Sequence, residues 1–132
     1  MEGVKPEERS FIRWQKSMEF GRRLGCHQMP KRSFFVKGWQ MFVCARCFGV
    51  IVGDFVGTAL FFLVHPPLLL SVCLLFPMAV DWGIQRLGIL ESTNVRRLLT
   101  GISCGVGLTF VYLRLIVLVA KIVAKVVSGF LT

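Results

Sequence analysis

Three long apolar segments, each bounded by polar or helix-breaking residues, constrain this chain more than any other feature of its sequence. They fall within residues 42–64, 68–90 and 98–120. A helix needs about 20 mostly apolar residues to cross a hydrocarbon core about 30 Å thick, and each segment reaches that length. The apolar residues are continuous rather than alternating, which favours helices over a membrane barrel. The sequence therefore predicts an all-α integral membrane bundle of about three transmembrane helices.

Two short breaks separate the predicted spans. Proline has no backbone N–H and disfavours a helical residue before it, so Pro66 and Pro67 end the first span. Residues 91–94, Glu-Ser-Thr-Asn, are typical of a loop that leads into a helix N-cap. A chain of 132 residues has room for one domain, so the three spans are expected to form a single membrane domain.

Basic residues are concentrated before the first span. Residues 1–41 hold nine Lys and Arg residues, the loop at 65–67 holds none, and the connection at 81–97 holds three. Because basic flanking segments are retained in the cytoplasm, we expect a multi-pass protein of the cell membrane with a cytoplasmic N-terminus. The basic segment is expected to attract anionic lipid headgroups. The net charge of +9 does not indicate a nucleic-acid partner, since the sequence has no recognition module.

Cysteine and histidine residues near the predicted cytoplasmic face form a candidate metal site. Cys26 and His27 are adjacent, and 17 residues separate Cys26 from the Cys-x-x-Cys pair of Cys44 and Cys47. Thiolate and imidazole are ligands that zinc prefers, and such a pair can place two sulfurs on one tetrahedral ion. In a reducing compartment, metal binding is favoured over a structural disulfide. The sequence predicts a zinc site from these four residues, either structural or beside a substrate pocket.

The same cysteines also allow a redox interpretation. Cys44 and Cys47 stand at the start of the first span, where the helix N-terminus and Arg46 would lower a thiol pKa. That arrangement suits a membrane thiol–disulfide oxidoreductase. A third interpretation treats the cysteines as unrelated juxtamembrane residues. Cys73 and Cys104, inside apolar spans, are interpreted as small packing residues.

A second polar group lies at the end of the second span and in the connection after it: Asp81, Gln85, Ser92, Asn94 and Arg97. Asp81 and Gln85 are four residues apart and share a helix face. Arg97 could hold a phosphate or carboxylate, which makes the group a candidate substrate-binding site. The structural alternative is an Asp81–Arg97 ion pair, with Ser92 or Asn94 as an N-cap. The predicted topology brings this group to the same membrane face as the cysteines.

Asp54 is predicted to lie roughly 10 Å deeper in the membrane than Cys47. An ionisable side chain at this depth indicates a proton or cation path. A small carrier that used Asp54 and Asp81 would need to be a homo-oligomer, because three helices enclose little space. The alternative is a hydrogen-bonded Asp54 held against a neighbouring helix.

Glycines recur at four-residue spacing on two of the predicted spans, at positions 49, 53 and 57 and at positions 101 and 105. Small residues at this spacing let helix backbones approach closely in lipid. The pattern favours a compact bundle or a dimer.

Several of these motifs follow one another in a specific order. The first half contains Cys26-His27-Gln28, Arg32-Ser33-Phe34 and Cys44-x-Arg46-Cys47-x-Gly49. The second half contains Pro77, Asp81, Gln85, Ser92, Asn94, Arg97 and Gly101. Over about residues 22–107 this order resembles an uncharacterised family of small bacterial and archaeal integral membrane proteins, a domain of unknown function. The resemblance implies that the polar residues belong together, and it implies no particular activity.

Overall fold

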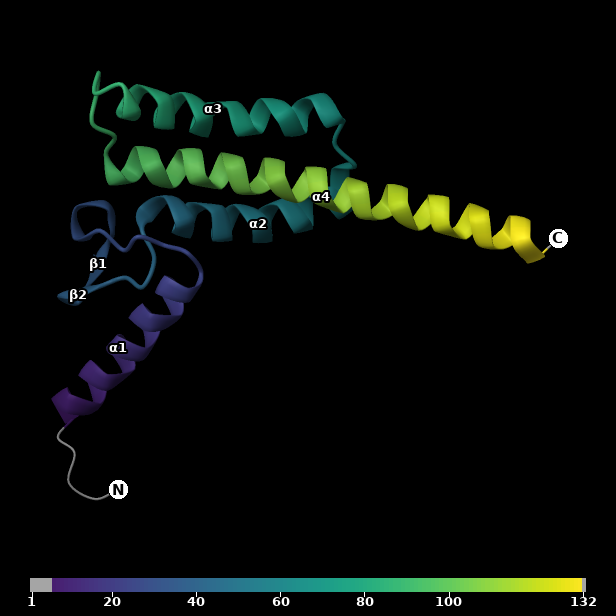
Figure 1. Cartoon of the computed structure of the whole chain (residues 1–132). Helices are drawn as coiled ribbons and strands as arrows, with labels where there is room; N and C mark the ends of the chain where they lie inside the picture. The colour runs from purple at the N-terminus through teal and green to yellow at the C-terminus, as the bar shows by residue number, and fades with distance from the viewer. Residues whose placement is uncertain (1–5, 132) are drawn as a thin grey trace.

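The structure is a computed structural model that describes residues 6–131. In chain order its elements are α1 (Pro6–Arg23), a 3₁₀ turn (Pro30–Arg32), β1 (Phe35–Val36), β2 (Trp39–Gln40), α2 (Ala45–Val64), α3 (Leu68–Arg86) and α4 (Asn94–Leu131) (Figure 1). Within the described range, α2, α3 and α4 are the three helices long and apolar enough to cross a membrane. The prediction of an all-α bundle with about three spans is confirmed.

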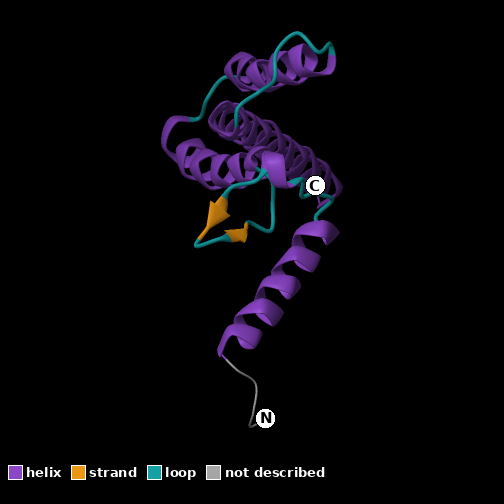
Figure 2. Ribbon diagram, turned by 90° about the vertical axis from the view of Figure 1, so that its left-hand side faces the viewer, coloured by secondary structure: helices purple, strands orange, loops and turns teal. Residues whose placement is uncertain are grey.

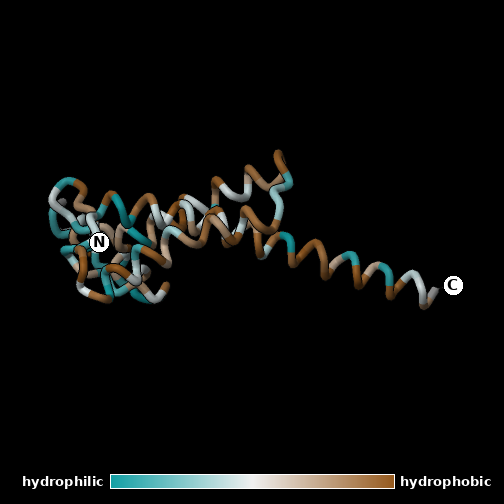
Figure 3. Tube along the Cα trace, turned by 90° about the horizontal axis from the view of Figure 1, so that it is seen from above, coloured by the Kyte–Doolittle hydropathy of each residue, from teal (hydrophilic) through white to brown (hydrophobic). Residues whose placement is uncertain are grey.

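The three apolar helices lie side by side with α4 in the middle (Figures 1 and 2). Helix α4 packs against both α2 and α3, whereas α2 and α3 make little contact with each other. Viewed from above, hydrophilic residues gather at the end of the bundle where α1 and the hairpin lie (Figure 3). At this end the chain enters α2, leaves α3 and begins α4, so the two predicted polar groups meet there.

The helix ends differ from the predicted spans for local reasons. Helix α2 begins at Ala45, because the preceding Cys44 has an extended backbone. Helix α3 ends at Arg86, shortly before Gly88 adopts a left-handed conformation with φ of 70°. Helix α4 begins at Asn94, and the hydroxyl of Thr93 accepts a hydrogen bond from the Arg96 N–H at 3.3 Å. Thr93 therefore caps this helix, in place of the predicted Ser92 or Asn94.

Helix α4 extends well beyond its neighbours. Its 38 residues run to Leu131, so it is about 57 Å long at 1.5 Å per residue, compared with about 30 Å for the 20 residues of α2. Figure 1 shows the second half of α4 projecting past the ends of α2 and α3. The bundle that positions the polar residues is therefore built by α2, α3 and the first half of α4.

The N-terminal segment is tied to the start of α2 by side-chain amides. Gln28 Nε2 donates to the carbonyl oxygens of Met18 at 2.6 Å and Phe42 at 2.7 Å. Gln40 Nε2 donates to the Gln28 carbonyl at 2.7 Å, and Trp14 Nε1 donates to the Gln40 carbonyl at 2.9 Å. These bonds join α1, the following loop and the hairpin, and they hold Cys26 beside the first turn of α2.

A two-residue turn closes the hairpin. Phe35 pairs with Gln40 and Val36 with Trp39, in antiparallel register. The turn residues Lys37 and Gly38 both have positive φ, at 50° and 81°. This backbone is that of a type I′ turn, whose twist suits a tight hairpin.

The glycine stripes form the contact between α2 and α4. A Cβ added at Gly49 or Gly53 would collide with the backbone of α4, and one added at Gly101 would lie 2.5 Å from the Arg46 carbonyl oxygen. A Cβ at Gly57 would lie 2.9 Å from the Cα of Val106. The predicted small-residue packing therefore occurs within one chain, as the interface of two membrane helices.

We predict that Gly53→Ala weakens the bundle, because the new methyl group meets the Ile102 carbonyl oxygen in α4. Overpacking of this kind costs about 1–3 kcal/mol in the free energy of unfolding. Gly83→Ala is the matched control, since an added Cβ there meets nothing within 4 Å and should be neutral or stabilising. Unfolding of both variants in detergent measures the difference; equal stabilities would contradict the α2–α4 contact.

Candidate functional site

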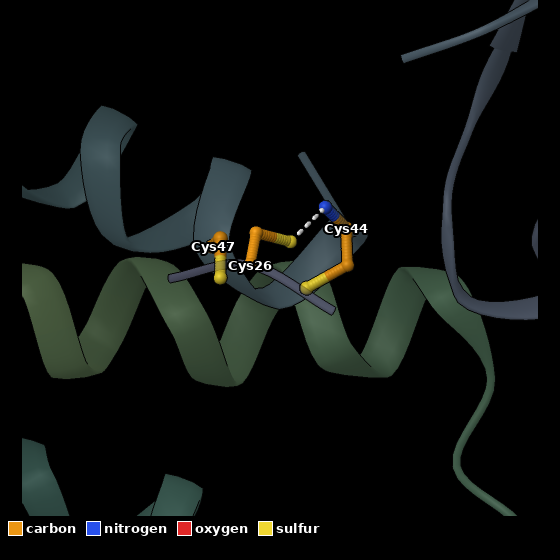
Figure 4. A group of neighbouring side chains, drawn as sticks. All are labelled: Cys26, Cys44 and Cys47. Atoms are coloured by element: carbon orange, nitrogen blue, oxygen red, sulfur yellow. Dashed lines mark hydrogen bonds between the residues drawn. The ribbon is translucent and has the colours of Figure 1, made fainter. Parts of the chain in front are cut away.

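Three cysteines from two separate segments converge at the start of α2. Cys26 lies in the loop after α1, Cys44 is the N-cap of α2, and Cys47 lies in its first turn. Their Sγ atoms all lie within 4.8 Å of one another (Figure 4). The Cys44 N–H also donates to Cys26 Sγ at 3.1 Å. The structure thus brings together the three thiols that the sequence analysis grouped.

The spacing of the sulfurs suits a tetrahedral metal. Zinc–sulfur bonds of about 2.3 Å put the sulfurs of a tetrahedral site about 3.8 Å apart. The three Sγ atoms lie within 4.8 Å of one another, at most about 1 Å wider than that separation, so these thiols could hold one metal ion. No pair of the chain's five cysteines is joined by a disulfide.

His27, the predicted fourth ligand, is not part of this cluster. Its side chain is exposed, whereas the neighbouring Cys26 is buried against the start of α2. His27 does line the cavity beside the cysteines. The cluster is therefore a set of three thiols with His27 at the edge of the adjoining cavity.

Cys44, which precedes the membrane-spanning helix, favours the thiolate form. A hydrogen bond from the Cys47 thiol lowers the pKa of Cys44 to about 5, although partial burial acts in the opposite direction. The backbone N–H groups of Cys47 and Arg46 contribute in the same direction as the thiol. A thiolate is the form that binds a metal or attacks a disulfide.

Asp81 in α3 is the centre of the second polar group. Its side chain is 2% exposed and lies between two guanidinium groups. Arg46 Nη2, from α2, donates to Asp81 Oδ2 at 2.7 Å, and Arg96 Nε, from α4, lies 2.7 Å from Oδ1. Ser92 Oγ donates to Oδ2 at 3.1 Å. One carboxylate therefore links all three apolar helices and the connection between α3 and α4.

The predicted Asp81–Arg97 ion pair is replaced by these contacts. Arg96, one position earlier in α4, takes the place that the sequence analysis assigned to Arg97. The sequence analysis assigns Arg46 an effect on the thiols and a place in the family motif, and the structure adds that it links the cysteine motif to Asp81. The sequence signals for this role are the position of Arg46 in a mostly apolar helix and its place in that motif.

Arg97 is buried, with 6% of its surface exposed. Its Nη1 donates to Asn94 Oδ1 at 3.2 Å, and its Nε has no hydrogen-bond partner among residues 6–131. With its amide oxygen turned toward the two arginines, Gln85 accepts from Arg97 Nη2 at 2.7 Å and from Arg32 Nη2 at 3.3 Å. Arg32 and Arg97 therefore meet at one neutral amide.

A cavity of about 450 Å³ joins the two polar groups. Its walls include all three clustered cysteines and His27, together with Arg32, Arg46 and Arg97. The cluster of thiols and the buried arginine thus face one space. The remaining predicted site residues, Gln85 and Ser92, line a second cavity of about 500 Å³ that shares Arg32 and Arg97.

Asp54 lies apart from these cavities, at the interface of α2 and α4. Thr109 Oγ1 in α4 donates to Asp54 Oδ1 at 3.0 Å. This contact is the helix–helix hydrogen bond that was the alternative to an ion path.

Comparison with known proteins agrees with the fold. Residues 26–111 match the family described as "Predicted membrane protein (DUF2085)". Over 92 residues the chain is 41% identical to an uncharacterised protein of Methanocaldococcus jannaschii. The match covers 64% of this chain and 59% of that protein, so the chain spans less than two thirds of the length of this relative. Over 88 residues it is 36% identical to an uncharacterised protein of Methanothermobacter thermautotrophicus, covering 63% and 79%. No solved structure matches the chain. The family match confirms the resemblance.

We predict that Asp81→Asn destabilises the protein by about 3 kcal/mol, because it leaves Arg46 and Arg96 without their shared carboxylate. Glu19→Gln is the control, since it removes an exposed, solvent-screened carboxylate from Arg22 and Arg23 and should change the stability much less. Chemical unfolding in detergent measures both variants. A fully stable Asp81→Asn protein would contradict the linking role of this carboxylate.

Proposed function

The chain belongs to the DUF2085 family of predicted membrane proteins, and we propose that it binds a zinc ion through Cys26, Cys44 and Cys47. The observation that carries this proposal is the approach of three thiols to within 4.8 Å without a disulfide. Two of the ligands come from one Cys-x-x-Cys turn and the third from a loop that Gln28 holds in place. Thiolates from separate segments are the ligands typical of zinc.

The proposed metal has a structural consequence. It would fix the loop after α1 onto the first turn of α2, because Cys26 and the Cys44–Cys47 pair come from those two elements. Three thiolates leave a fourth position of a tetrahedral ion for another ligand. The adjoining cavity, with His27 and Arg97 in its walls, supplies space for a water molecule, the imidazole or an anionic substrate group.

The proposed orientation has the cysteines on the cytoplasmic side of the cell membrane. The support for this orientation is the excess of Lys and Arg in residues 1–41 over the loop at 65–67. The cytoplasm keeps thiols reduced, which is the state that a zinc ion requires.

A thiol–disulfide oxidoreductase is the second candidate, favoured by the short distance between the Cys44 and Cys47 sulfurs, within 4.8 Å, together with the lowered pKa of Cys44. In that reaction the Cys44 thiolate would attack one sulfur of a substrate disulfide, which breaks the substrate S–S bond, releases the first substrate thiolate and forms a mixed disulfide. The Cys47 thiol, losing its proton, would then release the second substrate thiol. The two cysteines would end as a disulfide and the substrate as a dithiol, so the two electrons balance.

We predict about one zinc ion per chain in protein purified without chelator or a histidine tag, and a large loss of zinc in the Cys47→Ser variant. Cys73→Ser is the control, because Cys73 lies in α3 outside the cluster. Elemental analysis with a parallel count of free thiols measures the outcome. The metal site would be contradicted if the wild-type protein contained no zinc. It would also be contradicted if the Cys47→Ser and Cys73→Ser variants contained equal amounts of zinc. Loss of two thiols on mild oxidation would then support the redox reaction.

A further inference from the structure

We propose that Arg97 and Arg32 bind the phosphate group of an acidic membrane amphiphile, whose hydrocarbon chain enters the cavity beside the first turns of α2. This inference does not rest on the metal, because no sulfur takes part in holding the phosphate. It depends on three features of the described residues: a buried arginine without an ion-pair partner, other guanidinium groups near it, and apolar residues in the wall of the cavity that they share.

The first feature is the missing counter-charge of Arg97. Although the side chain is 6% exposed, no carboxylate among residues 6–131 lies within ion-pair distance of it. Asp81 already pairs with Arg46 and Arg96, and the exposed Glu91, which lines the second cavity with Arg97, is not within ion-pair distance of it. A buried charge without a partner is costly, and an anion bound at the free Nε would remove that cost.

The second feature is that other guanidinium groups lie near Arg97. Arg32 meets Arg97 at the Gln85 amide, which is neutral and cannot balance either guanidinium. Arg46 lines the same cavity and also has an unpartnered buried Nε. Guanidinium groups bind phosphate oxygens through paired N–H donors, so two or three of them in the wall of one cavity suit a phosphate with two negative charges.

The third feature is the apolar remainder of the cavity. Its other walls include Val50 and Ile51 of α2 and Met78 of α3. Leu24 and Met29, from the loop after α1, complete this apolar wall. Because Val50, Ile51 and Met78 lie in helices long and apolar enough to cross a membrane, this part of the cavity adjoins the proposed bilayer. A volume of about 450 Å³ accommodates a headgroup and the first part of a hydrocarbon chain. A free phosphate ion would leave this apolar part unused.

The test measures binding of phosphatidic acid, phosphatidylcholine and inorganic phosphate to the full chain by native mass spectrometry from detergent. We expect one phosphatidic acid per chain, bound at least about tenfold more tightly than phosphatidylcholine and resistant to excess inorganic phosphate. Arg97→Gln and Arg32→Gln should each weaken this binding by about tenfold, the effect of losing one good charged contact. Arg32 is exposed, so its variant should fold even if Arg97→Gln does not.

Arg23→Gln is the matched control. Arg23 ends α1, is exposed, lies 3.3 Å from Glu19 and lines none of the three cavities that include Arg32. Equal loss of binding in Arg23→Gln and Arg32→Gln would reduce the effect to general surface charge and overturn the proposal. Equal affinity for the two lipids would overturn it as well. Displacement of phosphatidic acid by inorganic phosphate at similar concentration would overturn the role of the hydrocarbon chain.

Discussion

The buried carboxylate of Asp81 determines how the polar end of this bundle is organised. A charged group at the end of a membrane helix is costly unless protein groups satisfy it, and Arg46, Arg96 and Ser92 do so from three other parts of the chain. Arg46 lies between Cys44 and Cys47 in sequence, so the same contact fixes the first turn of α2, which carries two of the clustered thiols. The site is therefore organised by one anion among several cations.

Close packing of α2 on α4 makes this arrangement possible. Gly49, Gly53, Gly101 and Gly105 let the two backbones touch, which brings the start of α2 next to the start of α4. Helix α3 packs on the other side of α4, and the cavity lies beside the first turns of α2, where the loop after α1, Met78 of α3 and Arg97 of α4 complete its wall. The contact that stabilises the bundle thus also creates the space beside the thiols, and Arg97 is left as a buried cation with a free donor.

Much of the fold and part of the candidate site could be predicted from the sequence, because the patterns that indicate them involve residues close together along the chain. Segment length and hydropathy were enough for the three membrane helices, and glycine spacing indicated a close helix contact. The Cys-x-x-Cys spacing grouped Cys44 and Cys47, and Cys26 joined them as expected. Each of these signals reflects either the bilayer thickness or the helical repeat.

The features that were predicted wrongly or not at all depend on contacts between residues far apart in the sequence. Whether Arg96 or Arg97 reaches Asp81 depends on the rotation of α4, which the Thr93 cap and the glycine contact set together. The hairpin was not predicted, because its two strands have two residues each and are too short to show a periodic pattern. His27 is adjacent to Cys26 but exposed, and adjacency along the chain does not indicate which of two side chains will be buried.

Zinc K-edge X-ray absorption of the purified protein tests the central claim most directly. The account predicts a shell of three sulfurs at about 2.3 Å and one lighter atom, since three thiols cluster here and line a cavity with room for a further ligand. A bound zinc surrounded only by nitrogen and oxygen would contradict it, because the metal would then lie away from Cys26, Cys44 and Cys47.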